Sequence, residues 1–149
     1  METVGDLLRL KGSQVLTTYE DKSVADAVAA LVENNIGSLI VLDDQHNITG
    51  IITERDIMRM SHHKGAELLE TKVKDSMTGK DDLIVGVVDD TLDYIMQVMT
   101  QNKIRHVPIV EGDRLLGMLS IGDVVKARLH AVQAENHYLR DFLGDKYPA

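Results

Sequence analysis

The chain has 149 residues, 44% of them hydrophobic, which is enough apolar material for one domain or for two small halves that share a core. A net charge of −8 argues against a surface that binds nucleic acid or anionic membrane, and the absence of cysteine excludes disulfides and thiolate-based sites. Because no apolar signal segment and no run of roughly 20 apolar residues is present, we expect a soluble cytoplasmic protein without a membrane span.

The first half of the chain predicts the order strand, helix, strand, strand, helix. A short apolar strand at Val15–Thr18 leads into a turn in which Ser23 is a typical helix N-cap. Apolar residues then recur at helical spacing from Val24 to Leu31, and the predicted helix ends near Asn35. The remaining predicted elements are strands at 37–43 and 48–53 and a helix at about Glu54–His62.

The second half, after a connector at Ser61–Ser76, predicts the same order again. A strand at Leu83–Val87 is followed by Thr91 as a second N-cap and by a helix that ends near Lys103. The remaining predicted elements are strands at 105–111 and 115–120 and a long helix at about Ile121–Leu143.

These two halves are one pattern written twice. Val15 aligns with Leu83 and Ser23 with Thr91 at one constant offset, and a single-residue deletion in a turn then brings Gly50 onto Gly117. The lead-in segments "TVGDLL" and "KVKDSM" also match. A duplicated β-α-β-β-α unit predicts an α/β protein, and each unit is too small to bury its sheet alone. We therefore expect the units to pack face to face as one pseudo-symmetric module.

Each half ends its last strand with a related segment, "GIITERD" at 50–56 and "GMLSIGD" at 117–123. The acidic residue falls where a strand passes into a helix, whose free N–H groups suit a phosphate. A carboxylate there can accept both hydroxyl protons of a ribose diol, while the preceding Thr53 or Ser120 adds a hydroxyl group. The alternative is that Asp56 and Asp123 only cap their helices, and the two roles are compatible.

The repeat, the "NKIRHVPIV" segment and the two terminal motifs resemble the CBS domain pair, also called the Bateman module, over about Val4 to Leu129. The expected domains are a first repeat at 1–66, a second at 67–130 and a C-terminal helical extension at 131–149. The resemblance implies a regulatory module that binds adenine nucleotides such as AMP, ADP or ATP, with S-adenosylmethionine or NAD as further possibilities. It also implies two related clefts between the repeats, and no cofactor beyond this regulatory ligand.

The resemblance carries over to two unequal sets of residues. In one cleft it implies a nucleotide site made by Thr17, Gly37, Ser38, Leu39, Ser120 and Asp123. In the other it implies Thr53, Arg55, Asp56, Val85, Arg105, His106, Val107 and Pro108. Val85 departs from the family pattern, which has Thr there, and the basic residues offer compensating contacts to phosphate. Arg55 and Arg105 have the alternative role of solvated surface residues.

Pro108 lacks a backbone N–H, which suits either an ordinary edge strand or a place where a ligand replaces the neighbouring strand. The histidines at 62, 63, 130 and 137 lack the spacing of a metal site, and no catalytic motif is present. We therefore expect no metal site and no enzyme activity.

The long last helix carries an apolar stripe, for which we consider packing on its own module or contact with a second copy in a homodimer. The stripe consists of Val125, Leu129, Val132, Asn136, Leu139 and Leu143. In the family two modules often pair as a flat, disc-like dimer. The favoured function is a sensor that relays ligand state to a separate effector protein. The alternatives are a structural or interaction protein with vestigial clefts and, more weakly, an enzyme with a nucleotide substrate.

Overall fold

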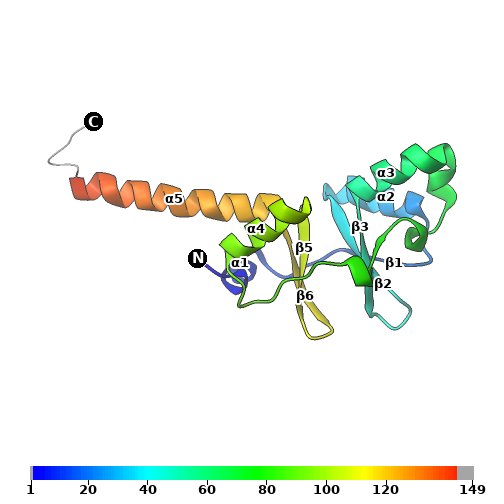
Figure 1. Cartoon of the computed structure of the whole chain (residues 1–149), viewed down its shortest axis with the longest axis horizontal. Helices are drawn as coiled ribbons and strands as arrows, with labels where there is room; N and C mark the ends of the chain where they lie inside the picture. The colour runs from blue at the N-terminus through cyan, green and yellow to red at the C-terminus, as the bar shows by residue number, and fades with distance from the viewer. Residues whose placement is uncertain (1, 144–149) are drawn as a thin grey trace.

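The computed structural model describes residues 2–143 and has two halves side by side, with one long helix projecting from the second half (Figure 1). A four-stranded sheet, ordered β1-β2-β3-β4, forms the first half, and a two-stranded sheet of β5 and β6 forms the second. The strands are β1 Thr17–Tyr19, β2 Ser38–Leu42, β3 Ile48–Thr53, β4 Thr78–Gly79, β5 His106–Glu111 and β6 Arg114–Ser120. The α-helices are α1 Val4–Lys11, α2 Val24–Asn34, α3 Glu54–Lys64, α4 Leu92–Asn102 and α5 Ile121–Leu143, and short 3-10 helices occupy 65–70, 73–75 and 80–82.

The predicted helices that follow the first strand of each repeat are confirmed, including both ends. The Ser23 hydroxyl accepts a hydrogen bond from the backbone of Asp26 at 3.0 Å, and Thr91 caps α4 in the same way. Both helices end in a left-handed residue, Asn35 at φ 52° and Lys103 at φ 54°. The α/β class with two repeats is therefore present, and the cap residues position each helix on its sheet.

The predicted strand at Leu83–Val87 is wrong. In the first half, β1 runs parallel to β2, and the backbone N–H of Ile40 donates to the carbonyl of Leu16 at 3.3 Å. The residue equivalent to Ile40 in the second repeat is Pro108, which has no N–H to donate to Ile84. The parallel ladder is therefore reduced to one bridge between Gly86 and Ile109.

The two lead-in segments pack on opposite halves. Helix α1, which we did not predict, begins with a capping box between Thr3 and Asp6 and buries Val4, Leu7 and Leu8 in the core of the second half. The equivalent Val73 is buried in the core of the first half. The backbone pairing crosses between the halves in the same way. Thr3 of the first lead-in bridges to Thr91 in the second half, and Lys72 of the second lead-in bridges to Ser23 in the first half. The packing thus crosses the expected limits at 1–66 and 67–130.

The glycine of each terminal motif makes room for one of these lead-ins. A Cβ atom on Gly50 would lie 2.3 Å from the carbonyl oxygen of Thr78, which follows the second lead-in. A Cβ atom on Gly117 would lie 2.7 Å from a methyl group of Leu8 in α1. The repeated glycine is therefore a packing requirement, which is separate from any ligand.

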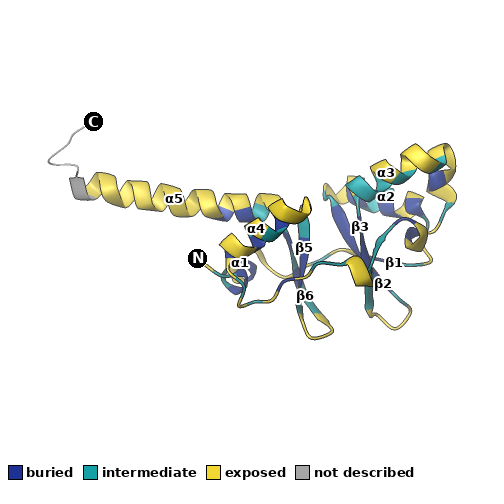
Figure 2. Ribbon diagram, in the orientation of Figure 1, coloured by how far each residue is buried: buried dark blue, intermediate teal, exposed yellow. Residues whose placement is uncertain are grey.

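A third apolar cluster joins the halves face to face. Ile40, Leu42 and Ile51 of the first sheet are buried against a set that includes Leu115 and Met118 of β6. Figure 2 shows this burial concentrated in the sheets and the helix faces that cover them, whereas most of α5 is exposed. Within residues 2–143, no helix has both the length and the apolar character that crossing a membrane requires.

Candidate functional site

Two clefts lie between the halves, and each contains one of the repeated aspartates. The Asp56 cleft encloses about 630 Å³ and the Asp123 cleft about 730 Å³, both within the range of small-molecule sites. The Asp56 cleft is lined by Ile51, 53–56, Met58, Arg59, Thr78, 82–84 and 102–106. The Asp123 cleft is lined by Lys11, 14–16, Asn34, 36–38, His106, Met118, Ser120 and Asp123. Both clefts therefore draw side chains from both repeats.

The carboxylate of Asp56 is held on both of its oxygens by internal donors. Oδ2 accepts from the backbone N–H of Thr53 at 2.9 Å and from its hydroxyl at 3.0 Å, while Oδ1 accepts from the hydroxyl of Thr78 at 3.2 Å. The backbone N–H of Asp56 donates in return to the Thr53 hydroxyl at 3.1 Å. This reciprocal pair is a capping box at the start of α3, so Asp56 has a structural role whatever else it binds.

Asp123 occupies the equivalent position at the start of α5 but has a different partner. Its Oδ2 accepts from the backbone N–H of Ser120 at 2.8 Å and from the ammonium group of Lys11 at 2.5 Å. Lys11 also donates to the carbonyl of Met118 at 2.6 Å. Burial opposes ionisation of Asp123, but the hydrogen bonds from Lys11 and Ser120 outweigh it and hold the pKa of this carboxyl below its ordinary value.

His106 is the residue that the two clefts share. Its imidazole lies so close to Gly37 that a Cβ atom there would be 3.0 Å from Nε2, and the Glu54 carboxylate borders the same point. Burial lowers the pKa of His106 below its ordinary value; Arg105 and Lys11 lower it further, while Glu54 and Asp123 oppose this shift. The ring is therefore held toward its neutral form at the boundary between two polar clefts.

The Asp56 cleft is the more basic of the two. Four cationic residues line it against three acidic ones, whereas the Asp123 cleft has one of each. The four are Arg55, Arg59, Lys103 and Arg105. Arg55 also donates to the carbonyl of Lys103 at 2.8 Å, so it ties α3 of one repeat to the end of α4 in the other.

Sequence reasoning missed several of the polar residues that line the clefts. Arg59 lies four residues after Arg55, so helical spacing could have placed it on the same face. No local pattern indicated Lys11, because its contact with Asp123 joins residues far apart in the chain. The others that sequence reasoning missed are Gln14, Asn34, Glu54, Thr78, Asp82, Asn102 and Lys103.

Some implied site residues do not line either cleft. Leu16 and Ile84 line the clefts in place of the expected Thr17 and Val85, one position later. The linings run through consecutive residues, 14–16 in one cleft and 82–84 in the other, and end one residue before the implied positions. Leu39, Val107 and Pro108 are also absent from the linings, and Leu39 and Val107 are fully buried in the core.

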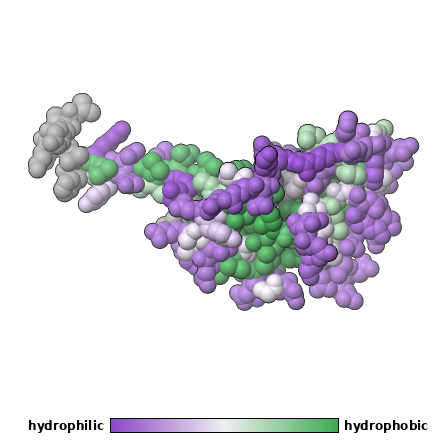
Figure 3. All heavy atoms as spheres, viewed as in Figure 1, coloured by the Kyte–Doolittle hydropathy of each residue, from purple (hydrophilic) through white to green (hydrophobic). Residues whose placement is uncertain are grey.

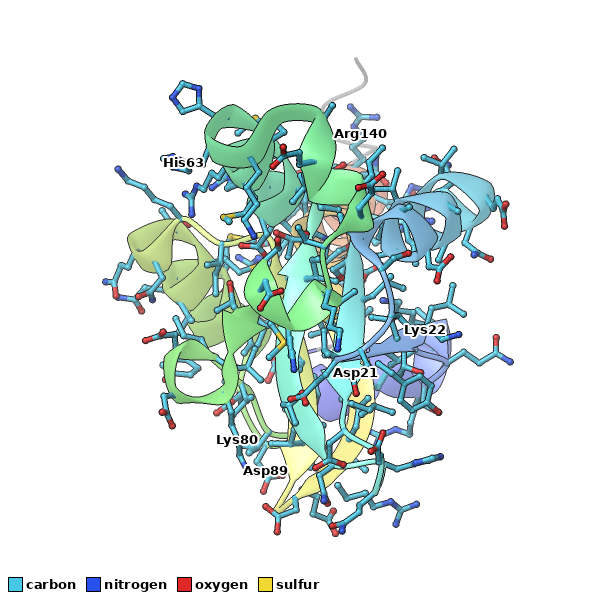
Figure 4. The ribbon with its side chains drawn as sticks, turned by 90° about the vertical axis from the view of Figure 1, so that its right-hand side faces the viewer. Asp21, Lys22, His63, Lys80, Asp89 and Arg140 are labelled. Atoms are coloured by element: carbon cyan, nitrogen blue, oxygen red, sulfur yellow. The ribbon has the colours of Figure 1, made fainter. Side chains whose placement is uncertain are left out.

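Histidines elsewhere in the chain do not gather into a metal site. His62 and His63 contact each other edge to face at the outer end of α3, and His63 points away from the body in Figure 4. No cluster of three or more potential ligands occurs within residues 2–143.

Comparisons of sequence and of structure with known proteins agree with one another on a single family. A family model described as "CBS domain" matches residues 4–63 and 79–130. The "CBS domain-containing protein CBSX3, mitochondrial" of Arabidopsis thaliana is 36% identical over 97% of this chain and 73% of its own. The structure of the CBS-domain containing protein ATU1752 from Agrobacterium tumefaciens superposes with a TM-score of 0.82 at 39% identity, covering 85% of this chain and 93% of that one. The structure of CBSX2 in complex with AMP covers 88% and 98%, at a TM-score of 0.70 and 28% identity.

Proposed function

This chain belongs to the CBS domain family, and from that premise we propose that its two clefts bind adenine nucleotides and that it acts as a regulatory module. The observation that supports this most directly is the position of the two aspartates. Each of Asp56 and Asp123 lies at a strand-to-helix junction inside a cleft that both repeats line. The AMP bound to the related CBSX2 structure supports the same ligand class.

We propose that the ribose diol is held by the aspartate of each cleft. Asp123 is the better acceptor of the two, because hydrogen bonds from residues 2–143 reach only its Oδ2. Asp56 has less room for a further donor, because its Oδ2 already accepts two hydrogen bonds and its Oδ1 accepts one from Thr78, which leaves one acceptor position on Oδ1 for a ribose hydroxyl. The helix N-terminus beside each aspartate then faces the phosphate.

The base of a nucleotide in the Asp56 cleft has an acceptor available in Ile84. Pro108 has no N–H to donate to the Ile84 carbonyl, and no other donor among the described residues reaches it. The exocyclic amino group of adenine is a donor of the kind that this carbonyl lacks. At the equivalent position of the Asp123 cleft, the carbonyl of Leu16 is already bonded to Ile40.

The difference in charge supports different phosphate lengths in the two clefts. The cations of the Asp56 cleft, of which Arg105 is one, suit ADP or ATP, because each added phosphate brings more negative charge and more acceptors. The Asp123 cleft offers the single cation Lys11, which suits AMP. Titration should therefore rank ATP above AMP in the first cleft and reverse or remove that order in the second.

A ligand in either cleft touches both repeats and can therefore bias their relative arrangement, provided that it binds one arrangement better than another. We propose that this change, passed on by the module or its homodimer, is read by a separate effector protein. The alternative is a structural protein with vestigial clefts, which the internal hydrogen bonds to both carboxylate oxygens of Asp56 favour for that cleft alone.

Isothermal titration of the wild type and of the variants Asp56→Ala and Asp123→Ala tests the proposal. AMP, ADP, ATP, NAD and S-adenosylmethionine are the ligands, and chromatography of each mixture checks for turnover. We expect adenylate binding in which each variant loses one class of site. Absence of binding by every ligand to a folded wild type would leave only the structural alternative.

A further inference from the structure

The last helix extends well beyond the body of the protein. Helix α5 runs from Ile121 to Leu143, and within its residues 121–141, whose burial the structure describes, the last buried residue is Ala127. Figure 1 shows the remainder projecting away from both halves, and Figure 2 shows it exposed up to the end of the residues whose burial is described. A helix of this length in water gains most of its stability from packing of an apolar face, so the projection calls for a partner.

Four of the exposed apolar residues of α5 follow a seven-residue repeat, written a to g, whereas Ile121 and Tyr138 fall outside its a and d positions. Leu129 and Asn136 fall at position a, while Val125, Val132 and Leu139 fall at position d. The four apolar side chains of this seam are exposed by 43% to 56%. Apolar side chains are visible along the projecting part of α5 in Figure 3.

The seam lies on the side of α5 that faces away from its own module. The residues that anchor α5 to the body are Val124 and Ala127, at positions c and f. Position f lies opposite the a and d seam in a coiled coil. A second helix can therefore cover the seam without displacing α5 from its module.

We propose that the seam of α5 pairs with the same seam of a second copy of this chain, as a parallel two-stranded coiled coil. This deepens the dimer part of the proposed function and does not depend on nucleotide binding. Asn136 then faces Asn136 of the other copy, and a single polar residue at position a is a device that sets register and oligomeric state.

The charged residues beside the seam select the parallel orientation. A parallel pair places Glu135, at position g, beside Arg140 of the other copy at position e, and does so twice. An antiparallel pair that aligns Leu129 with Leu139 brings Glu135 onto Glu135 and Lys126 onto Arg140. Within residues 2–143 neither Glu135 nor Arg140 has an ion-pair partner, and His137 and Asp141 pair with each other outside the seam at 3.3 Å.

A single introduced cysteine distinguishes the orientations, because the chain has none of its own. In the parallel pair, Leu139→Cys faces its counterpart across a d layer and should form an intermolecular disulfide under mild oxidation. In the antiparallel pair the two cysteines are ten residues apart along the axis, or about 15 Å, beyond the roughly 7 Å that a disulfide spans. Ala134→Cys, at position f, is the matched control and should stay monomeric on a denaturing gel.

Sedimentation of the full chain tests the pairing itself. We expect a dimer for the wild type, and a dissociation constant raised more than about 100-fold by Leu129→Glu, which places a charge in the seam. Glu135→Arg should weaken the dimer, and adding Arg140→Glu should restore it. A monomeric wild type, a dimer unaffected by Leu129→Glu, or failure of Leu139→Cys to cross-link a proven dimer would each overturn the proposal. Circular dichroism of each variant confirms that the module is folded.

Discussion

Replacing Asp123 by alanine should weaken AMP binding in the Asp123 cleft while leaving the module folded. Oδ2 of Asp123 accepts from Ser120 and Lys11, so Oδ1 is the oxygen that a ribose hydroxyl can reach without displacing another donor. A hydrogen bond to a charged group contributes about 1.5–3 kcal/mol. The variant should therefore lose about 1.5–3 kcal/mol of binding free energy, or roughly 10- to 150-fold in affinity.

The assay is isothermal titration with AMP, carried out in an Asp56→Ala background so that only one class of site contributes heat. Asp123→Asn is the matched control, because its amide oxygen can still accept one hydrogen bond, and we expect a smaller loss. The alanine variant also loses the bond from Ser120 at the start of α5, so its unfolding free energy should fall by about 1 kcal/mol. An unchanged AMP affinity in a folded Asp123→Ala protein would show that the aspartate is only a helix cap.

Four further substitutions, which make three predictions, test the fold and its charges. Gly50→Ala should lower the unfolding free energy measured in urea by about 1–3 kcal/mol, because the new Cβ atom meets a backbone carbonyl. Gly117→Ala should lower it less, because the neighbour there is a movable methyl group. Equal losses for the two variants would contradict this reasoning. Because the pKa of His106 is depressed in the folded state, the unfolded state binds the proton more readily, and stability should fall as pH drops below the ordinary pKa of 6.5. His106→Gln should lose this dependence of stability on pH. An unchanged pH dependence in the variant would assign it to another group. Asp123 contributes stability that is complete above its ordinary pKa of 3.8 and is lost as pH falls through its depressed folded pKa. Thermal melts of Lys11→Met should show a smaller loss of stability on acidification than the wild type. An equal loss would show that Lys11 does not lower the pKa of Asp123.

The parts of the fold that local chemistry decides could be predicted from the sequence. Ser23 and Thr91 mark the starts of α2 and α4. The similarity of the two repeats in sequence predicts that the two halves pack against each other. Helix α1 carried its own signal in the spacing of Thr3 and Asp6, which we did not use. The predicted second-repeat strand failed because Pro108 acts on a neighbouring segment, through a hydrogen bond that it cannot donate.

The two aspartates of the candidate site could be predicted from the sequence, whereas several of the other residues that line the clefts could not. Asp56 and Asp123 lie in separate clefts as expected from the repeated motif, whereas Lys11 reaches its cleft only through the crossed packing of α1. Thr17 and Val85 lie one residue beyond Leu16 and Ile84, where the linings end, and their contact with a nucleotide stays a prediction. The cytoplasmic location stays a prediction, and one relative is described as mitochondrial.

The exchange of lead-in segments bears on how such a protein could arise. The lead-in of each repeat packs into the core of the other repeat. A single repeat on its own would therefore leave the apolar side chain of its lead-in, Val4 or Val73, without a core to pack in. Two identical repeats that exchanged their lead-in segments would each have completed the core of the other, and a fusion of two such repeats into one chain would keep that packing. A chain severed in the connector should accordingly yield fragments that fold when mixed and not when separate.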